Sequence, residues 1–265
     1  MLRRVLSVLV AVPIILAVLF SPWPVLFKLL VVFCQLFALH EYSGLVQLRP
    51  AERKAFLVVG GLSAFSLGFV PFSAEGLLLW VAFLVILVFI YYLLGHEGLE
   101  GIGPSIGLTL LGIFYVALLP SFIARLRDFP QGAVWILLLL AMTWFNDTAA
   151  YFAGHWWGRR RLAPKVSPGK TWEGFWAGFI GSLIAFVLIR RYFYLPLTFS
   201  QGLLLVGIVG MLAPAGDLSE SLLKRGFGVK DSGHLIPGHG GLLDRIDALL
   251  FVAPVVYAFA KYFSG

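Results

Sequence analysis

SLLKRGFGVKDSGHLIPGHGGLLDRID, from Ser221 to Asp247, is the longest polar and glycine-rich stretch in an otherwise apolar chain. It holds several cationic residues, a Pro-Gly-His-Gly-Gly turn and, at its end, two carboxylates, Asp244 and Asp247. Residues three apart lie on one face of a helix, and two oxygen donors on one face suit a hard cation such as Mg²⁺. Glycines also let backbone N–H groups approach a phosphate. The stretch therefore predicts a metal-dependent phosphate-transfer site.

The composition of the whole chain excludes a soluble protein. Hydrophobic residues make up 60% of the 265 and charged residues 12%, whereas a soluble domain has about 25% charged residues. We therefore expect an all-α, polytopic membrane bundle. The net charge of +7 is better explained by cytoplasmic loops than by nucleic acid, which is not an expected partner.

Apolar runs of membrane-spanning length predict about nine transmembrane helices. The first run, residues 1–20, is followed by Ser-Pro-Trp-Pro rather than by a small-residue cleavage site, which favours a retained span over a signal peptide. The further spans are expected at 23–40, 55–72, 76–95, 104–124, 132–157, 173–190, 202–218 and 247–263.

The distribution of Lys and Arg predicts a cytoplasmic N-terminus. With that orientation, fourteen Lys and Arg fall on the cytoplasmic side, five on the other, and Lys28 lies within a span. The loop near 95–103 is assigned to the cytoplasm but has no Lys or Arg. This orientation puts the Ser221–Asp247 stretch in the cytoplasm. We expect one membrane domain over 1–265, with plain spans in 1–130 and the catalytic half in 131–265.

Asn146 and Asp147 lie inside the predicted span 132–157. A carboxylate at membrane depth is costly unless it is paired or bound to a metal, so it marks a candidate functional site. The alternative is a buried Asp that is hydrogen-bonded to a neighbouring helix.

Two further polar segments flank spans. The run Ser167-Pro168-Gly169-Lys170-Thr171 is a turn with hydroxyls and a cation that leads into a helix, whose N-terminus favours anions. It lacks the spacing of a P-loop. Asp217 is expected to end a span, with Ser221 and Lys224 on the same helical face. Lys224 and Arg225 could alternatively extend to lipid headgroups. His40-Glu41 lacks the second histidine of a zinc protease motif, and the aspartates favour a harder ion than zinc.

Three runs of the chain resemble motifs of phosphatidate cytidylyltransferases, also called CDP-diacylglycerol synthases. They are the stretch from Ser221 to Asp247, the NDTAAYFAG run from Asn146 to Gly154 and the SPGKTWEG run from Ser167 to Gly174. The resemblance implies transfer of the cytidylyl group of CTP to phosphatidate, with release of pyrophosphate, in phospholipid biosynthesis. It also implies Mg²⁺, with room for a second cation.

The roles expected from this resemblance fall into three groups. The catalytic residues are Asp147, Lys224, Arg225, Asp244 and Asp247. The substrate-binding residues are Asn146, Ser167, Lys170, Thr171, Ser221, Lys230, His239, Gly240, Gly241 and Arg245. The metal ligands are Asp217, Asp244 and Asp247. The expected partners are CTP, phosphatidate of the inner leaflet and other membrane lipids. A homodimer is compatible with this expectation. The expected location is the cell inner (plasma) membrane, with the active site facing the cytoplasm.

Three other functions are weaker alternatives. A CTP-using lipid kinase would release CDP rather than pyrophosphate. A CDP-alcohol phosphotransferase needs a DxxDGxxAR-type run, which this chain lacks. A transporter also places Asp within broken helices, but inverted repeats would favour it and none is seen.

Overall fold

The computed structural model describes residues 12–95, 100–233 and 240–263 of the chain. Residues 12–19 are helical. The labelled helices are α2 (Pro24–Leu45), α3 (Pro50–Phe69), α4 (Ala74–Gly95), α5 (Ile102–Gly112), a π-helical turn η1 (Ile113–Leu118), α6 (Leu119–Leu126), α7 (Gly132–Trp157), α8 (Trp172–Tyr192), α9 (Phe199–Gly226) and α10 (Leu243–Phe263). A hairpin of β1 (Arg161–Ala163) and β2 (Ser167–Thr171) precedes α8. The predicted all-α class is confirmed, with this short hairpin as its sheet component.

Seven helices within the described ranges are long and apolar enough to cross a membrane, and they make the protein a multi-pass membrane protein. They are α2, α4, the continuous segment Ile102–Leu126, α7, α8, α9 and α10. Helix α3 is not among the seven, because its first turn carries Glu52, Arg53 and Lys54. Residues 12–19 are the described end of the predicted first span, most of which lies outside the described residues.

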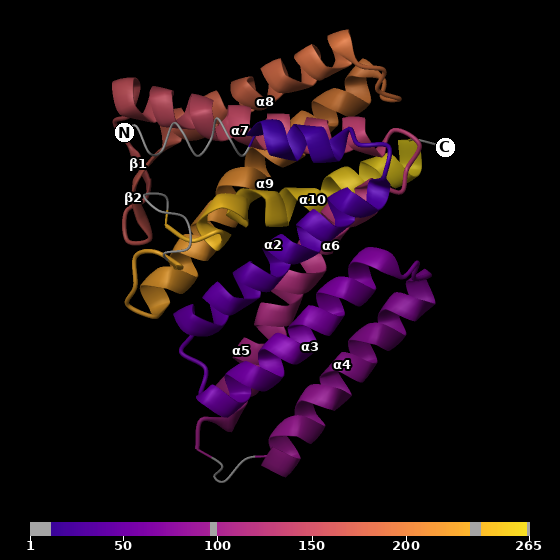
Figure 1. Ribbon diagram of the computed structural model, residues 1–265. Helices are drawn as coiled ribbons and strands as arrows, with labels where there is room; N and C mark the ends of the chain where they lie inside the picture. Colours follow the sequence, from indigo (N-terminus) through magenta and orange to yellow (C-terminus); the bar gives the residue numbers. More distant parts are fainter. Residues whose placement is uncertain (1–11, 96–99, 234–239, 264–265) are drawn as a thin grey trace.

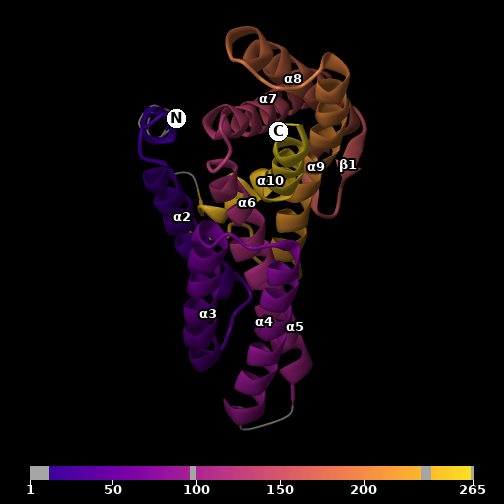
Figure 2. The same cartoon turned by 90° about the vertical axis from the view of Figure 1, so that its right-hand side faces the viewer.

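The helices form two packed groups that share α2 and α10. Helices α7 to α10 and the hairpin lie together at one end, whereas α3, α4 and α5 lie at the other, with α2 and α6 between them (Figures 1 and 2). One core cluster centres on Trp135 and Phe186, and the other on Tyr42 and Phe56. Helix α10 contributes to both clusters, so the two halves of the chain are packed against a common element.

Glycines let α7 and α8 pack closely. A Cβ atom at Gly178 would lie 2.8 Å from the Asn146 side chain, and one at Gly174 would lie 2.6 Å from the carbonyl oxygen of Ala150. Gly174, Gly178 and Ser182 recur every four residues, which is the small-residue pattern of close helix pairs in membranes. This contact fixes which face of α7 points toward α8.

The π-helical turn within Ile102–Leu126 is supported by a side chain from α2. A wider turn disturbs the regular intrahelical hydrogen bonds, and the buried Gln35 donates to the carbonyl oxygen of Ala117 at 2.6 Å. The long span was predicted from its apolar residues, but this irregularity was not.

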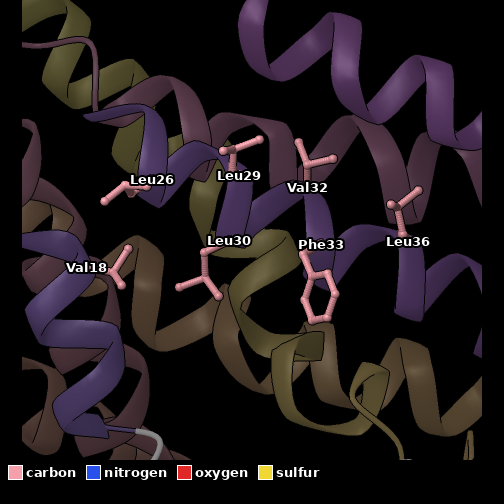
Figure 3. A pocket seen from close by; sticks show the side chains of 7 residues that line it. All are labelled: Val18, Leu26, Leu29, Leu30, Val32, Phe33 and Leu36. Atoms are coloured by element: carbon pink, nitrogen blue, oxygen red, sulfur yellow. The ribbon is translucent and has the colours of Figure 1, made fainter. Parts of the chain in front are cut away.

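The outer surface is apolar, as contact with lipid requires. Helix α4 exposes most of its large side chains, including Phe83 and Leu93, at 67% and 80% exposure. An apolar groove of about 510 Å³ lies between Val18 and the α2 residues from Leu26 to Leu36 (Figure 3). Every described residue that lines this groove is apolar, so the groove is distinct from the polar site described next.

Candidate active site

Helices α9 and α10 carry most of the charged residues of the candidate site. Asp217, Glu220, Ser221 and Lys224 recur along one face of α9, because their spacing of three and four residues matches the helical repeat. Helix α9 continues to Gly226, beyond the expected end of the span at 218, and keeps Ser221 and Lys224 on the helical face of Asp217, as predicted. The apolar run ends near Asp217, but the residues that follow it are mostly helix formers. This extension aligns Lys224 with Asp217.

The first cluster of charges surrounds Lys224. Its ammonium group contacts Glu220 Oε2 at 2.6 Å and Asp244 Oδ1 at 2.5 Å. Only 11% of the Lys224 side chain and 1% of the Glu220 side chain are exposed. Lys224 therefore joins α9 to α10 through a buried ion triad.

The other oxygen of Asp244 organises the loop before α10. Asp244 Oδ2 accepts the backbone N–H of Gly241 at 2.8 Å and that of Ser232 at 3.2 Å. Gly240 has a φ of +79°, which favours glycine, and a Cβ there would lie 2.9 Å from Asp244 Oδ2. The Gly241 amide, which we predicted to face a phosphate, is thus already bound to a carboxylate. The glycines serve the turn and its close approach to Asp244.

The second cluster centres on Lys170 of β2. Its ammonium group contacts Asp217 Oδ2 at 2.8 Å, and Ser221 donates to Asp217 Oδ1 at 3.3 Å. Asp147 of α7 and Asp247 of α10 interact electrostatically with Asp217 and with Lys170. Four segments of the chain therefore converge on one lysine and three carboxylates.

The Asp147 side chain is exposed, although it lies within the span Gly132–Trp157. The neighbouring Asn146 is 2% exposed and donates to Ser182 of α8 at 3.1 Å. Successive residues of a helix point about 100° apart, so the packing of Asn146 against α8 turns Asp147 away from that contact. Asn146, predicted to bind substrate, instead lies between α7 and α8.

The described part of the chain contains no group of three or more Asp, Glu, His or Cys side chains arranged to hold a metal ion. The three predicted ligands have different partners: Asp217 contacts Lys170, Asp244 contacts Lys224, and Asp247 accepts the N–H of Ala248 at 2.7 Å. The predicted metal set of Asp217, Asp244 and Asp247 is thus divided between the two clusters.

The remaining predicted residues surround these clusters. Arg225 is exposed and reaches the carbonyl oxygens of Val166 and Val229, both at 3.4 Å. Lys230 and Arg245 are exposed, and Ser167 is half-buried in β2. His239 lies outside the described residues.

Thr171 has a structural role at the start of α8. It is 3% exposed, and its hydroxyl accepts the N–H of Gly174 at 3.1 Å, which is an N-cap. The hydroxyl oxygen of Thr171 therefore caps α8, and its predicted contact with substrate stays a prediction.

We expect Thr171→Ala to lower the free energy of unfolding by about 1 kcal/mol, the usual cost of losing such a cap. The KM values for both substrates should stay within about twofold, because the Thr171 side chain is 3% exposed and faces the start of α8. Thermal unfolding in detergent and steady-state kinetics check this pair of results, and Thr171→Ser is the matched control that keeps the hydroxyl. A selective rise in one KM would restore a substrate contact.

Two carboxylates of this region were missed by sequence reasoning. Glu220 could have been found, because it lies four residues before Lys224 on a predicted helix. The other is Glu41 of α2, whose carboxylate accepts hydrogen bonds from the backbone N–H groups of Leu242 and Leu243. Its only signal in the sequence was a carboxylate at the end of an apolar run.

A profile of the cytidylyltransferase family matches residues 2–263, and the chain belongs to this family. It is 40% identical over 196 residues to a phosphatidate cytidylyltransferase of Synechocystis sp., covering 64% of this chain and 66% of that protein. It is 44% identical over 161 residues to the phosphatidate cytidylyltransferase of Thermotoga maritima (58% and 59% covered). It is 37% identical over 161 residues to that of Bacillus subtilis (60% of each covered). The matches span less than two thirds of each relative.

Proposed function

We propose that this protein transfers the cytidylyl group of CTP to phosphatidate and so makes CDP-diacylglycerol and pyrophosphate. The observation that carries the proposal is the convergence of Asp147, Asp217 and Asp247 on Lys170 in a membrane-spanning member of the cytidylyltransferase family. Its relatives named phosphatidate cytidylyltransferase support the choice of substrates.

The reaction needs one bond to form and one to break. An oxygen of the phosphatidate phosphate attacks the α-phosphorus of CTP, and the bond between that phosphorus and the oxygen bridging to the β-phosphate breaks. Pyrophosphate leaves with the bonding electron pair. The attacking phosphate is already largely ionised near neutral pH, so the protein has to position two anions and offset their charge rather than remove a proton.

The cations nearest the clusters suit this task. Lys170 lies against Asp217, and Arg225 is exposed beside the hairpin that carries Lys170. We propose that Lys170, Arg225, Lys230 and Arg245 bind the triphosphate or the lipid phosphate, together with Ser167, Ser221 and His239. Lys224 is enclosed by Glu220 and Asp244, so we assign it to holding Asp244 rather than to a first contact with substrate.

Magnesium fits the second cluster by its donor chemistry. Asp147, Asp217 and Asp247 are hard oxygen donors of the kind Mg²⁺ prefers, and Lys170 offsets only part of their charge. The described carboxylates are not arranged as a three-ligand metal site, so we propose that Asp147, Asp217 and Asp247 would hold Mg²⁺ only after exchanging their present contacts. Asp244 would join them only by exchanging its contacts with Lys224 or the loop. A bound Mg²⁺ would offset negative charge on the phosphates. A second cation is compatible with the same surplus of carboxylates.

We further propose that the protein lies in the cell inner membrane with its N-terminus and this site facing the cytoplasm. The excess of Lys and Arg on that side supports this orientation. The accessibility of Asp147 supports a site that opens toward the inner leaflet, from which phosphatidate would enter.

A product assay tests the proposal. Purified protein in mixed micelles with phosphatidate and Mg²⁺ receives CTP labelled at the α-phosphate. We expect label in the lipid and an equal amount of pyrophosphate, and removal of the divalent cation with a chelator should abolish both. Labelled CDP with unlabelled lipid would indicate a kinase, and no turnover with full-length, folded protein would contradict the proposal.

A further inference from the structure

Glu41 of α2 caps the N-terminus of α10 from a distant part of the chain. Its carboxylate accepts the N–H of Leu242 at 2.9 Å on Oε1 and the N–H of Leu243 at 2.8 Å on Oε2. The first N–H groups of a helix have no partner within it, and negative charge there is favourable. Glu41 is 7% exposed, so this contact is shielded from solvent.

Two glycines of the Ser221–Asp247 stretch make room for this carboxylate. A Cβ at Gly233 would lie 2.8 Å from Glu41 Oε1, and a Cβ at Gly241 would lie 2.7 Å from Glu41 Oε2. Both distances are shorter than atoms tolerate. Gly233 and Gly241 therefore pack directly against Glu41. At Gly241 the hydroxyl oxygen of Ser232 lies closer still, so both side chains leave no room for a Cβ there.

Glu41 is linked to the candidate active site by consecutive contacts. It holds Leu242 and Leu243, which directly follow Gly241, and the Gly241 N–H is bound to Asp244. Asp244 in turn contacts Lys224. Because Glu41 occupies the N-terminus of α10, a substrate phosphate cannot use that helix end as its anion site.

We propose that Glu41 is a positioning residue of the active site, which holds the Gly240–Asp244 segment so that Asp244 meets Lys224. The N-terminal half of the chain thus contributes to the site through α2. The effect on turnover rests on the proposed function, whereas the contact itself can be tested without it.

The test compares Glu41→Gln with Gln35→Leu in the full-length protein. Gln35 is the matched control, because it is a buried polar residue of α2 that bonds a backbone carbonyl remote from this loop. In Glu41→Gln one of the two carboxylate oxygens, each of which accepts a backbone N–H, is replaced by an amide NH₂ group that can only donate. Hydrogen exchange of the Leu242 and Leu243 amides should become at least about tenfold faster, as expected for loss of a charge-assisted hydrogen bond. Gln35→Leu should leave exchange at these amides within about twofold.

Kinetics give the second readout. Glu41→Gln should lower kcat by about tenfold or more, with KM for CTP within about threefold, because Asp244 is displaced while the exposed cations remain. Faster exchange with unchanged kcat would overturn the positioning role, and lost turnover with unchanged exchange would overturn the contact. If the wild-type protein itself shows no cytidylyl transfer, the proposed function fails, and the exchange data still decide whether Glu41 holds the loop.

A second variant guards against misfolding of Glu41→Gln. Gly233→Ala should push the Glu41 carboxylate away and reproduce both effects. The double variant should be no worse than the more impaired single variant, because both changes act through the same contact. Additive losses would mean that Gly233 and Glu41 act independently.

Discussion

Asp247→Asn is expected to reduce kcat by about 10³-fold or more while the protein stays folded in detergent. Asp247 belongs to the carboxylate cluster around Lys170, and it follows the Asp244 loop by one helical turn. If Asp247 helps to hold the proposed Mg²⁺, removing this donor would weaken the binding of the cation that offsets the charge of the transferring phosphates, at a cost of several kcal/mol. Each 1.36 kcal/mol is about tenfold in rate. The assay with labelled CTP measures this loss.

The folded state should survive Asp247→Asn, because the exchange is nearly isosteric and lowers the repulsion among three carboxylates. Asp128→Asn is the matched control. Asp128 also contacts a lysine, Lys28 at 2.5 Å, but lies outside both clusters. We expect that control to keep kcat within about twofold. Near-wild-type turnover of Asp247→Asn would contradict the role proposed for this carboxylate.

Lys224→Met is expected to destabilise the protein by about 3–5 kcal/mol, the range seen when one partner of a buried ion pair is removed. Without the ammonium group, Glu220 and Asp244 would face each other across the α9–α10 contact with no cation between them. Asp244 would lose its anchor on α9, so turnover should fall as well. Thermal unfolding in detergent and the product assay measure the two effects.

Arg225→Met is the stability control, since Arg225 is adjacent but exposed and reaches only two carbonyl oxygens at 3.4 Å. It should change stability by no more than about 0.5 kcal/mol. The double variant Lys224→Met with Glu220→Gln should recover part of the stability, because one of the two unpaired carboxylates is gone. A Lys224→Met protein as stable as the wild type would show that the triad does not hold α9 to α10.

The variants Asp247→Asn and Lys224→Met separate the roles of the two clusters. The cluster around Lys170 includes the exposed Asp147 and the partly exposed Asp217, and it is the place where we propose that the anionic substrates and Mg²⁺ bind. The triad around Lys224 is buried, and its ammonium group contacts both carboxylates. We therefore expect changes in the first cluster to affect turnover most and changes in the second to affect stability first.

Local features of the sequence were sufficient to predict the membrane class and most helices. Apolar runs longer than a bilayer core predicted α7 at its observed bounds, Gly132–Trp157, and the spans near α4 and α8 to within two residues at either end. This works because backbone polar groups within lipid must bond inside one helix, so hydropathy along the chain is enough. The runs around Asn146, Ser167 and Ser221 likewise indicated the family.

Contacts between helices could be read only from the tertiary structure. The sequence assigned both Asn146 and Asp147 to the candidate functional site. The packing of α7 on α8 decides that the Asn146 side chain is buried and that the Asp147 side chain is exposed. Lys224 was expected to bind a phosphate, but the packing of α9 against α10 places its ammonium group between Glu220 and Asp244. Glu41 meets Leu242 across 201 positions of chain. Helical periodicity determines which residues share a face, but which faces meet depends on side-chain packing and small-residue contacts far apart in the sequence.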